Sequence, residues 1–203
     1  ILDISGEVIH SATVTPQRGV LSPILADLYL HYALDLWFEK RIKRECNGEA
    51  LILRYADDFV CAFQYQQDAE SFYQQLNERL GKFGLEVCPE KTRMLPFSRN
   101  MLKRSETFDF LGFEFRRVLS RKFKPIIRRR TSRKKLKASI AAFTEWIKTK
   151  RNKKISKLMK TLRAKYRGYW NYYGVIGNYG SLKTFYYQTR RILFKWLNRR
   201  SQR

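Results

Sequence analysis

Acidic side chains are almost missing from the second half of this 203-residue sequence. Residues 116–203 contain 29 Lys and Arg but one acid, Glu145, whereas residues 1–115 contain 13 Lys and Arg and 17 Asp and Glu. This charge asymmetry indicates that the second half binds a polyanion, because so many cations would otherwise repel one another strongly. Nucleic acid and a membrane surface are the two candidates, and the many Tyr and Trp residues of the basic half favour nucleic acid.

Cysteine, histidine and long apolar runs are also scarce. The three cysteines, Cys46, Cys61 and Cys88, are widely spaced, which argues against a disulfide framework and indicates reduced thiols in a cytosolic compartment. With two histidines and no CxxC pair, a zinc site or an HNH-type nuclease module has no support. No apolar run approaches the roughly 20 residues that span a bilayer. We therefore expect a cytoplasmic protein that associates with nucleic acid and not with a membrane.

The segment Tyr55-Ala56-Asp57-Asp58 lies between two apolar runs, residues 51–53 and 59–63. Strand-like sequence on both sides of a tight polar turn predicts a β-hairpin. Its tip would present two adjacent carboxylates, and Mg²⁺ prefers carboxylate oxygens combined with substrate phosphates. An ordinary solvated turn is the alternative, since Asp is common in turns. The flanking strands and the charge of the chain favour a functional site.

One amphipathic helix is expected before this hairpin and another after it. Ser22 as the N-cap and Pro23 at the first helical position mark the start of the first helix. Its apolar residues recur at helical spacing: Ile24, Leu25, Leu28, Tyr29, Tyr32 and Leu36. The second helix ends near Gly84, which suits a C-terminal cap. Its apolar face consists of Ala69, Phe72, Tyr73, Leu76, Leu80 and Phe83.

Short strands complete the predicted first half. Residues 85–87 resemble one strand, and residues 108–115 alternate well enough to form another, with a turn at Gly112. This mixed order predicts an α+β fold with an antiparallel sheet covered by helices on one face. A domain boundary is expected near residue 120, which divides the chain into residues 1–119 and 120–203.

The basic half is predicted to be all-α. Residues 122–137 form a basic connector, and Thr131 or Ser132 is the expected cap of the first helix. Ser181 is the expected cap of the last helix. The segment 167–174, Arg-Gly-Tyr-Trp-Asn-Tyr-Tyr-Gly, is expected between the second and third helices. The three helices are predicted at about 133–149, 152–167 and 181–200.

Four motifs, in their order and spacing, resemble reverse transcriptases encoded by bacterial group II introns. They are Thr15-Pro16-Gln17-x-Gly19 with Ser22-Pro23, Tyr55-Ala56-Asp57-Asp58, Gly84-Leu85 with Glu90-Lys91-Thr92, and Phe110-Leu111-Gly112-Phe113. The basic tail with its 167–174 segment resembles the maturase, or thumb, region that follows the palm in those proteins. The resemblance covers essentially all of the chain. It implies a partial polymerase palm in residues 1–119 and a helical, RNA-binding thumb/maturase region in residues 120–203.

The resemblance also implies roles for individual residues of the first half. Asp57 would be a direct Mg²⁺ ligand, and Asp58 would assist the same metal site or hold the hairpin. Lys91 would lie near the nucleotide as a proton donor to pyrophosphate, although a solvated surface lysine is an equal alternative. The residues that would line the nucleotide and template pocket are Gln17, Arg18, Gly19, Tyr55 and Ala56. Those that would support the primer end, or form part of the core, are Phe110, Leu111 and Gly112.

RNA contacts are expected in the basic half. Aromatic faces stack on exposed bases and guanidinium groups hold phosphates, but a Tyr/Trp cluster between helices is commonly their packing core. We therefore expect Tyr169 and Trp170 to be mostly structural and the neighbouring cations to contact RNA. The predicted RNA-binding residues are Arg128, Arg129, Arg130, Arg133, Lys134, Arg163, Lys165 and Arg167.

Several features depart from the family pattern. The family has another catalytic Asp in an earlier palm strand, and this sequence leaves no room for it. Arg18 stands where the family usually has Gly, and Asp27 stands where it usually has Asn. The start, Ile1-Leu2-Asp3, has no Met and no secretory signal. We therefore expect a C-terminal fragment or one piece of a split protein, with an incomplete two-metal site and no polymerase activity alone.

Three functions are consistent with the sequence. The first is an RNA-directed DNA polymerase that uses an RNA template, a DNA primer, dNTP and Mg²⁺ to copy intron RNA during retrohoming. The second is a maturase that binds group II intron RNA and promotes its splicing without polymerase activity. The third is a related reverse transcriptase of a defence system. No motif indicates an oligomeric state.

Overall fold

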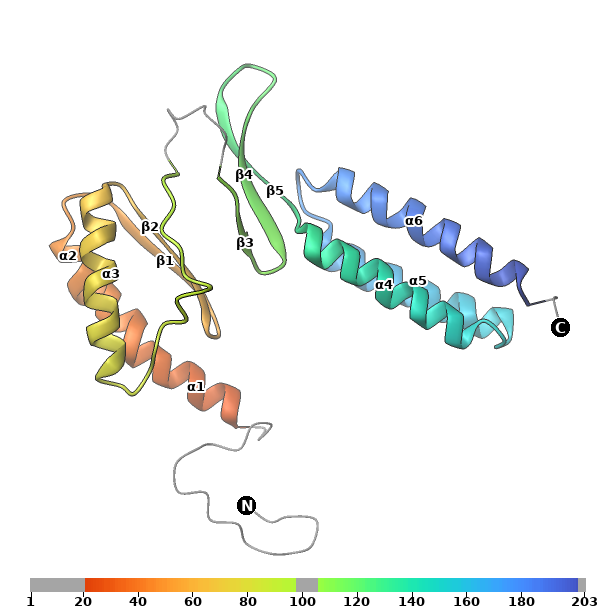
Figure 1. The fold of residues 1–203 in the computed structure, drawn as a ribbon, viewed down its shortest axis with the longest axis horizontal. Coiled ribbons are helices and arrows are strands. Elements are labelled where there is room, and N and C mark those ends of the chain that lie inside the picture. The colour runs from red at the N-terminus through yellow and green to blue at the C-terminus, as the bar shows by residue number, and fades with distance from the viewer. Residues whose placement is uncertain (1–20, 98–105, 201–203) are drawn as a thin grey trace, which may run out of the picture. The chain divides into compact units, whose positions relative to one another are not determined.

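The computed structural model describes residues 21–97 and 106–200, and its fold is α+β, as predicted (Figure 1). The predicted nucleotide-pocket residues Gln17, Arg18 and Gly19 lie outside the described residues. The chain divides into two compact units, residues 1–96 and 97–203. The division expected near residue 120, where the sequence becomes strongly basic, remains a prediction.

The first unit is a β-hairpin packed against helices (Figure 1). The strands β1 (Ala50–Tyr55) and β2 (Asp58–Phe63) pair antiparallel, with Tyr55 opposite Asp58. One helical segment comprises α1 (Ser22–Leu30), two π-helical turns (His31–Asp35 and Phe38–Ile42) and α2 (Lys43–Glu45). The remaining helix is α3 (Gln66–Gly81).

The core of this unit lies on one face of the hairpin. Ile52, Phe59 and Cys61 occupy alternate positions on that face, as strand geometry requires, and pack against the helices. Phe72 of α3 lies at the centre, and its ring centroid is 5.2–5.7 Å from those of Trp37, Phe38 and Phe63. The predicted hairpin and the apolar face of α3 are confirmed.

The first helix differs from its prediction. It begins at Ser22 with Leu21 as the N-cap, so Ser22 lies inside the helix. None of the residues of α1 is buried, although its apolar residues follow helical spacing. Burial starts in the first π-helical turn, with Ala33 and Leu34. Spacing shows which residues share a face, but it does not show whether another element packs on that face.

Residues 82–97 contain no strand, so the strand predicted at 85–87 is wrong. Leu85 and Val87 still pack against the core, but no described strand pairs with their backbone. The predicted cap at Gly84 is confirmed. Gly84 has φ +65°, and the Leu85 N–H donates to the Leu80 carbonyl at 3.0 Å, which closes the end of α3.

The second unit contains a three-stranded antiparallel sheet and three long helices (Figure 1). The strands are β3 (Phe108–Phe110), β4 (Phe113–Leu119) and β5 (Pro125–Thr131). The helices are α4 (Arg133–Lys150), α5 (Ile155–Tyr173) and α6 (Tyr179–Asn198). The strand and turn expected at residues 108–115 are confirmed as the β3–β4 hairpin. The connector expected at 122–137 instead forms β5 and the start of α4.

The ends of the three helices agree only in part with the capping residues predicted from sequence. Ser132 caps α4, and its hydroxyl accepts from the Lys135 N–H at 3.4 Å, as predicted. Helix α5 continues to Tyr173, so the segment 167–174 lies mainly inside a helix. The predicted cap Ser181 is wrong, because α6 begins two residues earlier with Asn178 at its N-cap.

Asn178 joins three elements of the second unit. Its side chain is fully buried, and its Oδ1 accepts from the Thr131 N–H at 2.8 Å. Its Nδ2 donates to the Thr131 hydroxyl and to the Tyr173 carbonyl, each at 2.8 Å. The end of β5, the end of α5 and the start of α6 therefore share one polar anchor that sequence reasoning missed.

Candidate functional site

The two carboxylates lie at the tip of the β1–β2 hairpin. Ala56 and Asp57 form the turn, and Asp58 is the first residue of β2. Tyr55, Ala56, Asp57 and Asp58 are all exposed. Ala56 has φ +54°, a left-handed conformation that costs an alanine about 1 kcal/mol. A strained turn persists only where the surrounding structure holds it, and such turns are concentrated at functional sites.

Arg54 holds this turn from within the protein. Its guanidinium binds Asp35 through two hydrogen bonds, from Nε at 2.8 Å and from Nη2 at 2.5 Å. Its Nη1 donates to Asp27 at 2.6 Å and to the carbonyl of Ala56 at 3.0 Å. The Arg54 side chain is only 10% exposed. One largely buried cation therefore joins α1 and the first π-helical turn to the strained residue of the hairpin tip.

The same contacts set the electrostatics behind the tip. The hydrogen bond from Arg54 holds the pKa of Asp35 below its usual value of 3.8, and the Asp35 carboxylate raises the pKa of Arg54. The negative charge of Asp27 is paired with Arg54, whose Nη1 lies 2.6 Å from the Asp27 carboxylate. Sequence reasoning missed Arg54, although a cation directly before the tip was the available signal.

The hairpin tip offers part of a metal site. Asp57 and Asp58 provide exposed carboxylate oxygens, which are the ligands that a hard cation such as Mg²⁺ accepts. Within residues 21–97 and 106–200, no three His, Cys, Asp or Glu side chains gather into a metal-binding group. The two carboxylates therefore fit one wall of a divalent-cation site.

Lys91 lies in an exposed turn of the first unit. Its N–H donates to the Cys88 carbonyl at 3.2 Å, and the Thr92 hydroxyl donates to the same carbonyl at 2.9 Å. No hydrogen bond or ion pair of the described residues joins Lys91 to Asp57 or Asp58. The role of Lys91 therefore stays a prediction.

The predicted primer-support residues form the β3–β4 turn. Leu111 has φ +49° and Gly112 has φ +77°, the pair of left-handed residues that a two-residue hairpin turn of type I′ requires. The Leu111 carbonyl accepts from the Tyr172 hydroxyl, and the Gly112 carbonyl accepts from the Ser132 N–H, both at 2.9 Å. Phe110 is buried. The turn is therefore held by the helices of the second unit.

The predicted RNA-binding arginines of the sheet differ in whether they are exposed or already paired with an acidic side chain. Arg128 and Arg129 are exposed on β5, and Arg128 lies opposite Arg116 of β4. Like charges placed opposite each other are destabilising, so a bound anion would relieve this pair. Arg130 instead donates from Nε to Glu114 at 2.9 Å, and its Nη2 lies 2.6 Å from the same carboxylate oxygen, which makes Arg130 partly structural.

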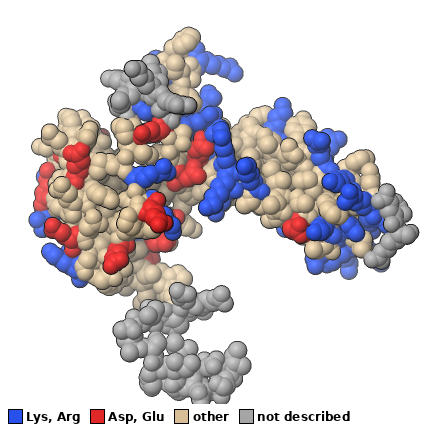
Figure 2. All heavy atoms as spheres, viewed as in Figure 1, with Lys and Arg blue, Asp and Glu red and all other residues tan. Residues whose placement is uncertain are grey.

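The helical cations lie on more than one surface. Arg133 and Lys134 are exposed in the first turn of α4. Arg163 and Arg167 line an open pocket of about 530 Å³ together with Met159, Leu162, Tyr166 and Trp170. Lys165 does not line this pocket, and its Nζ lies 5.2 Å from the ring centroid of Trp146. Figure 2 shows Lys and Arg crowding the visible face of this unit, with few acids among them.

Tyr169 and Trp170 belong to the packing of α5 against α6. The Tyr169 ring stacks on Phe185 with centroids 3.7 Å apart, and burial raises the pKa of Tyr169 to about 12. Trp170 contacts Phe185 and Tyr186 edge-on. Both rings therefore pack between the two helices, and their expected lack of a direct role in RNA binding stays a prediction.

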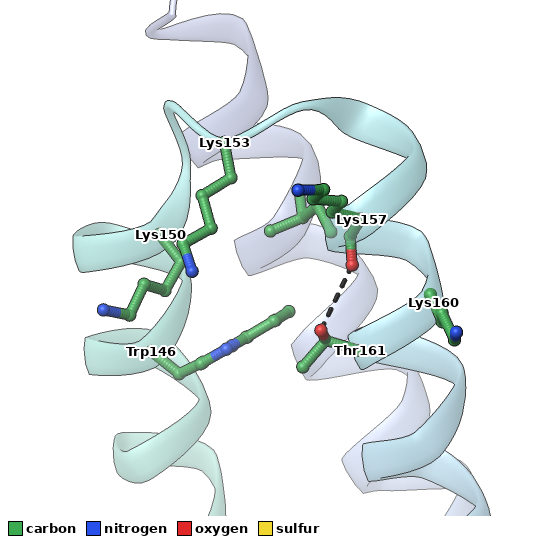
Figure 3. A pocket seen from close by; sticks show the side chains of 7 residues that line it. Trp146, Lys150, Lys153, Lys157, Lys160 and Thr161 are labelled. Atoms are coloured by element: carbon green, nitrogen blue, oxygen red, sulfur yellow. Dashed lines mark hydrogen bonds between the residues drawn. The ribbon is translucent and has the colours of Figure 1, made fainter.

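A second pocket contains cations that sequence reasoning did not select. It has a volume of about 450 Å³ and lies between α4 and α5 (Figure 3). Its lining residues are Trp146, Lys150, Lys153, Lys157, Leu158, Lys160 and Thr161. The recurrence of lysine every three or four residues across the α4–α5 connection was the available signal.

The first half of the chain matches a known family. Residues 2–115 match the family described as reverse transcriptase (RNA-dependent DNA polymerase). The chain belongs to the reverse transcriptase family. The match covers more than half of this reverse transcriptase and includes both the carboxylate tip and the Leu111–Gly112 turn. No curated protein matches the chain.

Membership of this family implies an RNA template and therefore nucleic-acid binding. Each helix within the described parts of this reverse transcriptase is too short or too polar to cross a bilayer.

Proposed function

We propose that this chain is the later palm and the thumb/maturase part of a group II intron reverse transcriptase that acts in the bacterial cytoplasm. The observation that carries the polymerase part is the Asp57–Asp58 tip, clamped by Arg54 within the matched region. Residues 1–119 supply the palm and residues 120–203 supply the RNA-binding thumb/maturase region. The ordered motifs and the basic, aromatic second half favour an intron-encoded member of the family.

In the proposed reaction, Asp57 would hold Mg²⁺ directly and Asp58 would assist at the same site. Bound Mg²⁺ lowers the pKa of a primer 3′-hydroxyl and stabilises the pyrophosphate leaving group. The contribution of Arg54 is geometric, because it fixes the Ala56 carbonyl and with it the direction of the tip. Two carboxylates supply only one wall of a two-metal site. We therefore expect no templated dNTP incorporation by this 203-residue chain alone.

The polymerase role is tested by Asp57→Ala in a full-length context. This change should reduce cDNA synthesis by at least about a thousandfold, because a ligand of the reacting centre is lost. Asp109→Asn, which removes an exposed carboxylate from β3, serves as the matched control and should leave synthesis unchanged. Undiminished synthesis by Asp57→Ala would refute the assignment of the tip.

The maturase role is a second function, supported by the basic surfaces of α4, α5 and α6. It predicts that Asp57→Ala spares splicing of the intron RNA, because the RNA-binding half keeps its cations. Splicing is measured on the same preparation as cDNA synthesis. Equal loss of both activities would contradict the proposed separation of the two roles.

A further inference from the structure

We propose that the pocket between α4 and α5 binds a single-stranded nucleic-acid segment, stacking one unpaired base on Trp146 while the surrounding lysines hold the adjacent phosphates. The proposal deepens the proposed RNA-binding function of the basic half and rests on it. It assigns a base-binding position to residues that the sequence motifs did not include.

The volume of the pocket is large enough for a ligand of nucleotide size. Its volume of about 450 Å³ lies within the range of sites that enclose small ligands. Figure 3 shows the indole of Trp146 extending from α4 into the space between the two helices. Lys150 comes from the end of α4, Lys153 from the connection, and Lys157 and Lys160 from the first turns of α5. An aromatic wall is thus combined with cations from three consecutive segments.

No charge within the described residues compensates these lysines. Four of the seven lining residues are lysine and none is acidic. The nearest acid in sequence, Glu145, lies 3.8 Å from Lys148, outside the lining. None of the four Nζ groups forms an ion pair with a described residue. The N-terminus of α5 adds the positive end of a helix dipole. A polyanion therefore fits this pocket better than a neutral ligand.

Trp146 is held firmly enough to act as a stacking platform. It is partly buried, and it packs against the core of Phe143, Ile147, Leu158 and Leu162. The Phe143 ring centroid lies 5.4 Å away, and Lys165 Nζ lies 5.2 Å from the indole centroid. A fixed ring loses little freedom when a base stacks on it, which favours binding.

The combination of an aromatic wall with lysines should let the pocket distinguish a single strand from a duplex. Bases within a duplex are stacked on one another, so a duplex would present only phosphates to the lysines. An unpaired base can enter a concave site and use both the aromatic wall and the cations. Single strands should therefore gain from Trp146, whereas duplexes should gain only from the lysines.

The first experiment measures fluorescence anisotropy with the complete 203-residue chain. The probes are a labelled oligouridylate of about 12 nucleotides and an abasic oligomer of equal length and charge. The chain should bind the oligouridylate about tenfold more tightly than the abasic oligomer. Trp146→Leu should remove this preference and leave the affinity for the abasic oligomer unchanged, whereas Trp146→Phe, which keeps an aromatic ring, should retain most of it.

The lysines are tested with a matched pair of double variants. Lys153→Gln with Lys157→Gln should weaken the binding of both oligomers and reduce the slope of log K against log salt by about 1.4, as expected for two lost phosphate contacts. Lys183→Gln with Lys195→Gln removes the same charge from α6 and should reduce the slope by less. Equal effects of the two pairs would overturn the pocket assignment.

Photocrosslinking provides a readout that needs no substitution. An oligomer carrying 5-iodouridine should crosslink to the peptide that contains Trp146, as identified by mass spectrometry. Crosslinks confined to other peptides, or an unchanged preference in Trp146→Leu, would overturn the base-stacking role while leaving RNA binding intact. If the unmodified chain binds neither oligomer, both this proposal and the proposed RNA-binding function are wrong.

Discussion

Arg54 is the residue on which the geometry of the hairpin tip depends. It is one position before Tyr55, yet its partners Asp27 and Asp35 are 27 and 19 positions away. The left-handed Ala56 keeps its conformation while its carbonyl accepts from Arg54. The tip is therefore specified by long-range ion pairs as well as by its own turn sequence.

Arg54→Met should destabilise the hairpin by about 2 kcal/mol. This value lies between those of exposed and buried ion pairs, since Asp27 is 64% exposed whereas Arg54 is 10% exposed. Hydrogen exchange of peptides from β1 and β2, followed by mass spectrometry, measures the opening free energy. Arg41→Met, which removes an exposed ion pair with Glu45, is the control and should leave the opening free energy of β1 and β2 unchanged. Equal protection in both variants would contradict the anchoring role.

The Arg54–Asp35 pair should also make stability depend on pH. The pKa of Asp35 is lower in the folded state than its ordinary 3.8, chiefly because Arg54 donates to it. Its contribution is therefore fully present above about pH 5 and is lost as the pH falls through the lowered folded value. Urea unfolding followed by circular dichroism between about pH 6 and pH 3 measures this loss. Asp35→Asn should show a shallower acid dependence, and an identical profile would exclude the pair as its source.

At the scale of elements, the β3–β4 turn and α5 form one structural assembly. The turn needs left-handed backbone at Leu111 and Gly112, and Tyr172 and Ser132 bind its two carbonyls. A Cβ atom at Gly112 would lie 3.1 Å from the Tyr173 hydroxyl. Residues that resemble a primer-support segment are thus positioned by the same helices that carry the basic surfaces.

Gly112→Ala should destabilise the second unit by about 2 kcal/mol, from the left-handed conformation and the crowding at Tyr173. Gly84→Ala is the matched control, because Gly84 is also left-handed, with φ +65°, but has nothing within 4 Å of the added Cβ. It should cost about 1 kcal/mol. Urea unfolding compares the two free energies. A cost for Gly112→Ala no greater than for Gly84→Ala would exclude the contact with Tyr173.

At the scale of the whole molecule, charge is divided along the chain. Residues 116–203 contain 29 cations and one acid in the sequence, and the structure spreads those of its described residues over β4, β5, α4, α5, α6 and the turns between them. Several separate surfaces can therefore contact phosphates together. Binding through many phosphates releases counterions, so affinity depends steeply on salt.

RNA affinity should therefore fall by about a thousandfold or more between roughly 50 and 200 mM salt, as expected for six or more phosphate contacts. Anisotropy titrations of the chain with a labelled RNA over this range measure the slope. A neutral osmolyte at matched osmolality provides the control and should leave the affinity unchanged. Binding that does not respond to salt would contradict the electrostatic account.

Local signals predicted much of this protein. The strand–turn–strand pattern predicted the carboxylate hairpin, and the glycines at 84 and 112 marked real left-handed positions. The strand expected at 85–87 failed because alternation cannot supply a hydrogen-bonding partner. The cap expected at Ser181 failed because Asn178, fixed by contacts to β5 and α5, begins the helix earlier.

The sequence by itself determined the α+β class, the carboxylate tip and the division of charge, because periodicity, turn chemistry and composition act over short stretches of chain. Only the tertiary structure decided that Arg54 clamps the tip, that α5 supports the β3–β4 turn, and that lysines from three segments surround Trp146. These features depend on which elements pack together. Such packing is set by the burial of apolar faces between distant residues, and no short segment of sequence contains it.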